Sequence, residues 1–137
     1  MRPLLLAAAL CALAGCGGSD TRVNEDRPPS PINITAAIDD DKVLVTPKRF
    51  GAGPVVLIVS NQSSEEQEVT FETNELAGEQ GGIQVKSRPI GPSSTGTVQV
   101  TPRPGTYRIR VGTSAIKPAQ VEVGAARGTA QDELLLP

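Results

Sequence analysis

Two cysteines lie only five positions apart near the N-terminus of this chain. Cys11 and Cys16 both fall in the stretch CALAGCGGSD, residues 11–20. Two thiols at this spacing can form a disulfide, ligate a metal, act as a redox pair or serve unrelated purposes. Cys11 lies inside an apolar run that extends from Leu4 to Gly15, whereas Cys16 directly follows that run. The sequence on either side of each thiol therefore has to decide between these alternatives.

The apolar run has the layout of an export signal. Arg2 supplies one positive charge, an apolar stretch of about a dozen residues follows, and small residues come last. The stretch is shorter than the roughly 20 apolar residues that a transmembrane helix needs. We therefore expect residues 1–15 to be a cleaved signal peptide and not a retained membrane span.

The residues that end the run are Leu13-Ala14-Gly15-Cys16, and they resemble the lipobox of bacterial lipoproteins. The resemblance implies that the Cys16 thiol receives diacylglycerol, that the chain is cut before Cys16, and that the new amine can be acylated. Two or three acyl chains, at about 0.8 kcal/mol per buried methylene, make a stable anchor. We predict that Cys16 is the lipidation site on an extracytoplasmic membrane face, and that Cys11 leaves with the signal. The alternative is an ordinary secretory signal with an incidental cysteine.

The composition excludes several kinds of chemistry. The chain contains no histidine, and with Cys16 lipidated it has no free thiol, so imidazole or thiolate metal ligation and histidine base catalysis are excluded. Cleavage after residue 15 removes Arg2 and leaves 12 basic residues against 15 acidic ones. This mild acidity does not suit a nucleic-acid partner. We expect no cofactor and a core of aliphatic side chains, since the chain has few aromatic residues.

The rest of the chain divides into a tether, a domain and a tail. Residues 16–31 are polar and rich in Gly and Pro, which predicts a flexible tether with a span of about 20 Å. In residues 32–124, apolar and polar residues alternate with a period of two, and Gly, Pro, Ser and Asn separate the runs. This pattern predicts seven or eight strands in an antiparallel Greek-key β-sandwich, with PVVLIVSN as a central strand. Residues 125–137 form a tail that holds at most one helical turn.

Two stretches carry a second resemblance. They are VTPKRFGAGPVVLIVSNQSSEEQEVTFE and IGPSSTGTVQVTPRPGTYRIRV, which resemble the cupredoxin-like domains of exported bacterial proteins. In copper-binding members, the resemblance places one histidine at Gln67, the cysteine at Val111, and a further histidine and methionine within GTSAIKPAQ. None of these ligand types occurs at those positions. The resemblance thus implies a cupredoxin-like or Ig-like scaffold without copper electron transfer.

One cluster of acidic residues is a run of three. Asp39, Asp40 and Asp41 are candidate ligands for Ca²⁺, which prefers oxygen donors. Three adjacent acids lack the spaced ligands of a calcium loop, and a hairpin turn is the favoured interpretation.

A second acidic cluster lies on one predicted strand. Glu66, Glu68 and Glu72 alternate on one face, where they form a cation site or simply a solvated surface. In cupredoxin-like topology this strand neighbours the one with Arg108 and Arg110, so we expect cross-strand Glu–Arg pairs. Exposed pairs of this kind contribute well under about 1 kcal/mol each.

Two further features have structural interpretations. Phe50-Gly51-Ala52-Gly53-Pro54 has glycines like a phosphate loop, but no Lys-Ser/Thr follows, and we predict a turn. Tyr107 follows Pro104-Gly105 at the start of a predicted strand. A tyrosine there can hydrogen-bond back to the backbone at a Greek-key corner.

These features predict a lipid-anchored lipoprotein that presents a metal-free β-sandwich as a binding or accessory module of the cell envelope. Its partners are the membrane, through the lipid, and an envelope protein or secreted ligand. One alternative is a metal-handling or redox accessory lipoprotein that uses carboxylates in place of the lost ligands. Another is a lipid-anchored hydrolase. We expect no enzyme activity, because no Ser–Lys spacing or paired-carboxylate motif is present and a triad would need lysine as the base.

Overall fold

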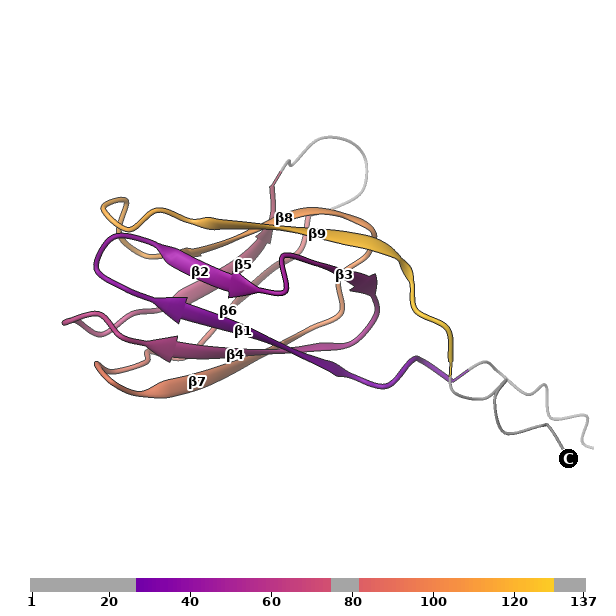
Figure 1. Ribbon diagram of the computed structural model, residues 1–137, viewed down its shortest axis with the longest axis horizontal. Helices are drawn as coiled ribbons and strands as arrows, with labels where there is room; N and C mark the ends of the chain where they lie inside the picture. The colour runs from indigo at the N-terminus through magenta and orange to yellow at the C-terminus, as the bar shows by residue number, and fades with distance from the viewer. Residues whose placement is uncertain (1–26, 75–81, 130–137) are drawn as a thin grey trace, which may run out of the picture.

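Nine strands in two stacked sheets make up the part of the chain that the structure, a computed structural model, describes: residues 27–74 and 82–129 (Figure 1). The strands are β1 (Ile32–Ile38), β2 (Val43–Thr46), β3 (Arg49–Ala52), β4 (Val55–Asn61), β5 (Val69–Thr73), β6 (Gln84–Lys86), β7 (Thr95–Val100), β8 (Gly105–Val111) and β9 (Ala119–Ala126). One sheet has the order β2-β1-β4-β7 and the other β3-β9-β8-β5-β6. The predicted all-β sandwich is confirmed. The predicted signal peptide, Cys16, most of the tether and the end of the tail lie outside the described residues.

The sheets are mixed, whereas the sequence predicted antiparallel pairing throughout. β1 runs parallel to β4, and β3 runs parallel to β9; the remaining pairs of neighbouring strands are antiparallel. The reason is a crossing between layers. After the β1–β2 hairpin, the chain enters the second sheet as β3 and returns to the first sheet as β4, which then lies beside β1 in the same direction. A crossover connection of this kind joins parallel strands.

Strand β3 is the element that the sequence prediction missed, since Phe50 to Pro54 was expected to be a turn. Phe50 and Ala52 point into the core, and only Gly53-Pro54 remains as the connection to β4. Gly53 has a φ of 127°, a conformation that favours glycine. Two inward-facing residues are too short an alternation to distinguish a strand from a glycine-rich turn. With β3, the described part of the chain has nine strands, where the sequence predicted seven or eight.

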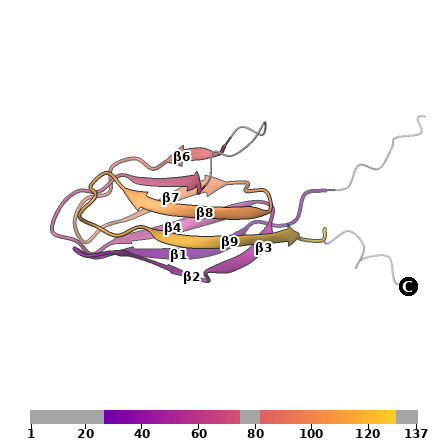
Figure 2. The same cartoon turned by 90° about the horizontal axis from the view of Figure 1, so that it is seen from above.

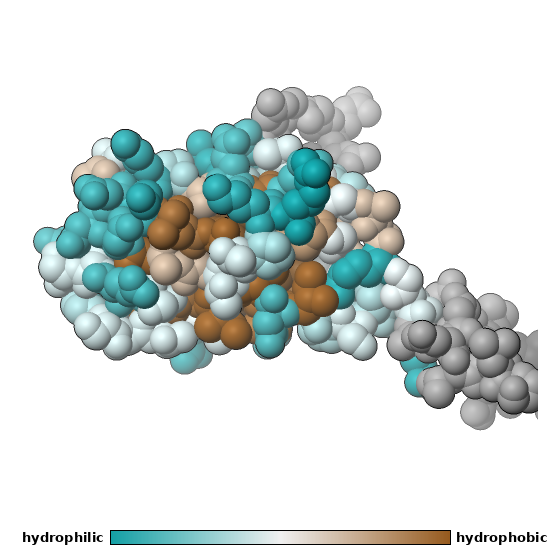
Figure 3. All heavy atoms as spheres, viewed as in Figure 1, coloured by the Kyte–Doolittle hydropathy of each residue, from teal (hydrophilic) through white to brown (hydrophobic). Residues whose placement is uncertain are grey.

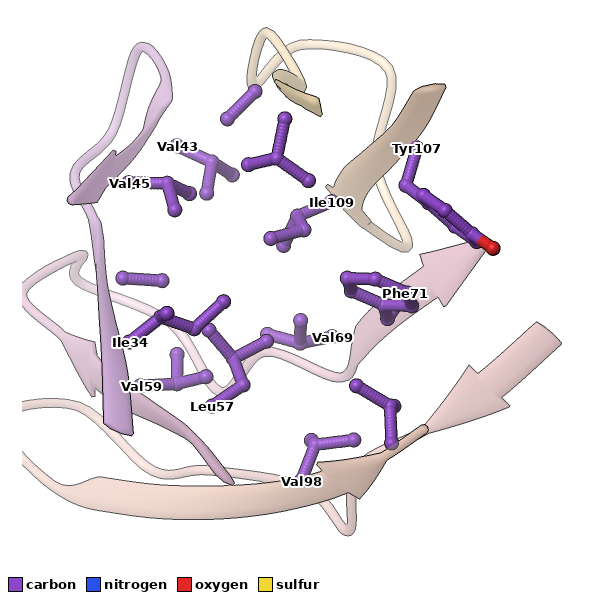
Figure 4. Packing of buried hydrophobic residues seen from close by; sticks show 14 of the residues in the cluster. Ile34, Val43, Val45, Leu57, Val59, Val69, Phe71, Val98, Tyr107 and Ile109 are labelled. Carbon is purple, nitrogen blue, oxygen red and sulfur yellow. The ribbon is translucent and has the colours of Figure 1, made fainter. Parts of the chain in front are cut away.

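The core lies between the two sheets and follows the period-two pattern. Ile34, Leu57 and Val59 of one sheet point toward side chains of the other, including Ile109 (Figure 4). These four side chains have no exposed surface. Burying a side chain of this size contributes about 1.5–3 kcal/mol, so the aliphatic core is the main source of stability.

The aromatic residue Tyr107 closes one corner of the core. Its ring stacks on Phe71 with a centroid distance of 5.0 Å. Its hydroxyl donates to the Arg103 carbonyl at 2.9 Å and accepts from the Arg103 N–H at 3.1 Å. The prediction that this tyrosine hydrogen-bonds to backbone at the strand entrance is confirmed.

Both ends of the described chain leave the sandwich on the same side (Figure 1). Arg127, just after β9, donates from Nη1 to the Ser30 carbonyl at 2.6 Å and from Nη2 to the Pro54 carbonyl at 2.5 Å. One arginine thus fastens the segment before β1 to the start of β4. Within the described ranges, no helix has the length and apolar character needed to cross a membrane.

Candidate functional site

The connections at the opposite end of the sandwich are the first candidate site, which we call the loop end: residues 39–42, 62–68, 87–94 and 112–118. Backbone hydrogen bonds join these connections to one another and to the strands. Gln62 N–H donates to the Ile38 carbonyl at 2.7 Å, and Lys117 N–H donates to the Asp41 carbonyl at 2.8 Å. The loop end is therefore a set of mutually braced turns.

A buried polar cluster lies beneath the loop end. The Asn61 amide donates from Nδ2 to the carbonyls of Glu65 and Ile90, at 2.7 and 2.8 Å. Its Oδ1 accepts from the N–H and the hydroxyl of Ser63, at 3.0 and 2.7 Å. Gln67 adds a longer bond of 3.4 Å from Nε2 to the Ser63 hydroxyl. Asn61, Ser63 and Gln67 are all buried, so these bonds satisfy groups that water does not reach.

Two of the three aspartates of the loop end, Asp39 and Asp40, use their carboxylates in turn structure. Asp39 Oδ1 accepts from the N–H groups of Asp41 and Lys42, at 2.9 and 2.6 Å. These backbone bonds hold the pKa of Asp39 below its usual value. Asp40 Oδ1 accepts from the N–H of Ser64 at 3.0 Å, which ties the β1–β2 turn to the β4–β5 connection. The carboxylates brace the hairpin turn that the sequence predicted.

The glutamates of the predicted acidic strand do not act together. Glu66 is exposed, and Glu68 pairs with Lys86 at 3.1 Å on the surface. Glu72 lies in β5 and contacts arginines of the neighbouring strand. Among the residues that the structure describes, no three His, Cys, Asp or Glu side chains form a group that could hold a metal ion.

The second candidate site is the Glu72 cluster on the outer face of the five-stranded sheet. Glu72 Oε1 accepts from Arg108 Nε at 2.5 Å and from Arg110 Nε at 2.9 Å, and Gln84 Nε2 donates to Oε2 at 2.9 Å. The cross-strand Glu–Arg pairing that the sequence predicted is present at Glu72. The expectation of a solvated surface pair is wrong there, because Glu72 is only 7% exposed.

The surroundings of Glu72 explain its electrostatics. The hydrogen bond from Arg110 is the largest influence, and with those from Gln84 and Arg108 it lowers the pKa of Glu72 from 4.5 to about 2 against the opposing effect of burial. The same bond raises the pKa of Arg110. Arg108 and Arg110 remain about two-fifths exposed while covering the carboxylate. The cluster is an ion-paired brace between β5 and β8, with its anion already neutralised.

The outer face of the four-stranded sheet differs in kind. Along β1, β2, β4 and β7 the burial pattern alternates, and none of the outward-facing residues is ionisable. They are Asn33, Thr35, Ala37, Leu44, Thr46, Val56, Ile58, Ser60, Thr95, Thr97 and Gln99. In Figure 3, hydrophobic residues gather over β1, β2 and β4, and hydrophilic residues lie above them and over the loop end.

Solved structures of other proteins share this arrangement of strands. No protein-family model matches the chain, and no curated protein sequence matches it. Auracyanin A, described as a "blue" copper protein from the green thermophilic photosynthetic bacterium Chloroflexus aurantiacus, superposes with a TM-score of 0.52 at 15% identity over 69% of this chain and 100% of its own. Auracyanin B superposes with a TM-score of 0.53 at 16% identity over 72% of this chain and 91% of its own. The domain has the cupredoxin-like fold. At such identities the likeness extends to the fold alone.

The residues of the cupredoxin-like domain do not fit a copper ion. Of the positions that the resemblance associates with ligands, Gln67 carries an amide that is engaged in the polar cluster, and Val111 is a buried hydrocarbon. The loop from 112 to 118 contributes Ile116, also buried, and neither imidazole nor thioether. Copper sites of this kind need thiolate and imidazole donors. The described residues of the loop end therefore do not supply the donors of such a copper site.

Proposed function

We propose that this protein is a bacterial lipoprotein, anchored through Cys16 on an extracytoplasmic membrane face, whose cupredoxin-like domain is a metal-free binding or accessory module. The support for the anchor is the order of segments in the sequence. A positive residue, an apolar run and Leu13-Ala14-Gly15-Cys16 precede the polar tether. The domain that follows has the fold of the auracyanins, one of which is described as a "blue" copper protein, but a different set of side chains.

The observation that carries the module's role is the buried polar cluster at the loop end. Gln67 stands at a position that the resemblance associates with a copper ligand, and its amide donates to Ser63, which in turn donates to Asn61. Asn61 donates to the Ile90 backbone carbonyl. A hydrogen-bonded set of amides and hydroxyls makes a rigid support for loops and supplies no redox centre. We accordingly assign the protein a binding role and no catalytic one.

The placement of the chain ends favours presentation of the loops away from the anchor. The segment before β1 is held by Arg127 at the end opposite the loop end. A strand of seven residues is about 23 Å long. A partner in the envelope would therefore meet the loops and the sheet faces, with the tether end toward the membrane.

Lipid labelling tests the anchor. In a bacterial host that processes lipoproteins, Cys16→Ser should abolish incorporation of labelled fatty acid and release the protein from the membrane fraction, because the thiol that accepts diacylglycerol is gone. Cys11→Ser is the matched control and should change neither. Lipid on the Cys16→Ser protein would contradict the proposal.

Metal analysis tests the module. The purified full chain should contain copper, zinc and calcium at far below one ion per molecule. Binding of any of them near one ion per chain would replace the proposed role with the metal-handling alternative.

A further inference from the structure

The open side of the sandwich between β6 and β7 has the properties of a docking groove. These two strands are edges of different sheets, and they lie together along one side of the molecule (Figure 2). A groove of about 670 Å³ separates them, lined by residues 85–91 and 94–99. Val85, Ile90 and Val98 are the apolar residues of its lining. Ile90 and Val98 are each 4% exposed and Val85 is half-buried, so a chain that entered the groove would cover apolar surface chiefly at Val85.

The free edge of β7 presents unused backbone groups to this groove. Gly53 N–H donates to the Pro102 carbonyl at 3.3 Å, and Asn61 N–H donates to the Ser94 carbonyl at 2.9 Å. In an antiparallel pair, hydrogen-bonded positions recur at every second residue, so the even-numbered residues of β7 direct their N–H and C=O groups to β4. Thr95, Thr97 and Gln99 therefore direct theirs away from β4. Within the described chain, no strand other than β4 pairs with β7.

This edge lacks the usual protection against strand addition. Natural edge strands carry charges, proline or bulges, or they are very short. β6 has three residues and includes Lys86; β3 has four residues, includes Arg49 and is bulged against β9. β2 has four residues and is continued by a bridge between Lys42 and Lys117. β7, with six residues and no charge or proline, is the longest and least protected of the four edges.

Gly96 lets Ile90, one of the residues that line the groove, lie close to the backbone of β7. A Cβ at this position would lie 2.6 Å from Cδ1 of Ile90, which packs directly against the β7 backbone. A side chain at residue 96 would therefore require Ile90 to shift.

The ionisable residues of the groove lining determine the chemistry of the occupant. They are Lys86 and Arg88, both cationic and exposed, and the lining contains no acidic residue. Lys86 is paired with Glu68 outside the groove. Arg88 makes no ion pair with another described residue. Acidic side chains on an incoming segment would complement this rim.

We propose that the groove binds an extended acidic segment of a partner protein, which pairs with β7 as an added strand. Alternate side chains of the segment would contact Val85 and Ile90, and those between would approach Arg88. Backbone pairing supplies affinity in this mode of recognition, and the side chains supply selectivity. The inference specifies how the proposed module binds; it rests on that proposal for the module's role but not on the lipid anchor.

Amide exchange measured on the full chain in detergent micelles tests the docking. The probe is a blocked seven-residue peptide of alternating valine and glutamate. Saturating peptide should slow hydrogen exchange at the amides of Thr95, Thr97 and Gln99, because these N–H groups gain acceptors. The same peptide with lysine in place of glutamate should bind at least about threefold more weakly in low salt. Absence of binding, equal binding of the two peptides, or binding without protection of these three amides would overturn the proposal.

Two pairs of variants sharpen the test. Thr97→Pro removes one outward N–H that β4 does not use, and should weaken peptide binding about threefold to tenfold; Thr97→Val keeps the N–H and should leave binding within about twofold. Arg88→Glu should weaken binding of the acidic peptide, and Arg103→Glu, the same charge change at an exposed residue outside the groove lining, should not.

Self-association is the competing outcome. Concentration-dependent protection of the same three amides without peptide would assign the edge to a second copy of the chain and would overturn the partner proposal. Lipid labelling at Cys16 is independent of this experiment, so failure of the docking and failure of the anchor are separately visible.

Discussion

The two outer faces of this sandwich contrast sharply, although the strands beneath them share one core. The face of the five-stranded sheet holds the Glu72 cluster and, further along, the pair between Arg49 and Glu122 at 2.7 Å. The face of the four-stranded sheet has no ionisable residue and includes Leu44, which is 48% exposed. On the charged face, ionisable side chains pair with one another, whereas the strands of the uncharged face present no ionisable side chain. The free β7 edge belongs to the uncharged sheet.

This contrast indicates which face is engaged in ion pairs within the domain and which face is available to bind a partner. A carboxylate that accepts four hydrogen bonds from three side chains is committed to the domain, and a partner that bound the carboxylate would have to replace those bonds. Threonine, valine and isoleucine on a sheet surface can be covered without the cost of desolvating charge. The proposed docking edge therefore lies on the sheet whose covering costs less.

The largest effect should come from neutralising Glu72. Glu72→Gln leaves Arg108 and Arg110 close together without a shared anion, and we expect a loss of about 1–3 kcal/mol in the free energy of unfolding. The arginines are partly exposed, so the loss should stay below that of a fully buried pair. Urea unfolding measures it. Glu122→Gln, in the exposed pair with Arg49, is the matched control and should cost under about 0.5 kcal/mol. Equal costs would show that the cluster is an ordinary surface pair.

A pH series should isolate the same carboxylate. The pKa of Glu72 is lowered to about 2 in the folded protein from its ordinary value of 4.5, which applies in the unfolded chain. The unfolded chain therefore binds the proton first as pH falls. Its contribution to stability is complete above about pH 4.5 and is lost as pH decreases toward 2. Glu72→Gln should flatten the decline in unfolding free energy over this range, with a smaller slope left by Asp39. An unchanged slope in the variant would contradict the assignment.

The smallest effect should come from trimming the uncharged face. Ile58 points outward from β4 and is half-buried, so Ile58→Val should cost less than about 0.5 kcal/mol. Ile109, with no exposed surface, is the matched control, and Ile109→Val should cost about 0.5–1.5 kcal/mol. If Ile58→Val cost as much as Ile109→Val in thermal unfolding, the uncharged face would be part of the core of a larger assembly.

Local patterns in the sequence were sufficient for some of these features. The alternation from Ile32 to Ile38 and in PVVLIVSN predicted strands correctly, because period two reports which side chains face a core. Glu72 and Arg108 were expected to pair, and they are opposite one another in the register of β5 and β8. The hydrogen bond of Tyr107 was predicted correctly because its backbone partner, Arg103, lies only four residues earlier in the chain.

Other features depended on contacts that no local pattern records. Phe50 and Ala52 form a strand because β9, some seventy residues later, provides the pairing partner. Glu72 is buried because long arginine stems cover it, which alternation along β5 does not reveal. The groove beside β7 results from the position of β6 in the other sheet. The signal for it was only the absence of charge in TGTVQV, residues 95–100.

The contact of Arg127 with Ser30 and Pro54 has a mechanical consequence. A pull on the segment before β1 is shared between β1 and the start of β4, and it acts along the strands. Force between this end and a partner paired with β7 would load the hydrogen bonds of β1 with β4 and of β4 with β7 in shear, so that many must break together, whereas the bonds of a hairpin that is peeled open break one at a time. A module fastened this way can sustain tension without opening its core.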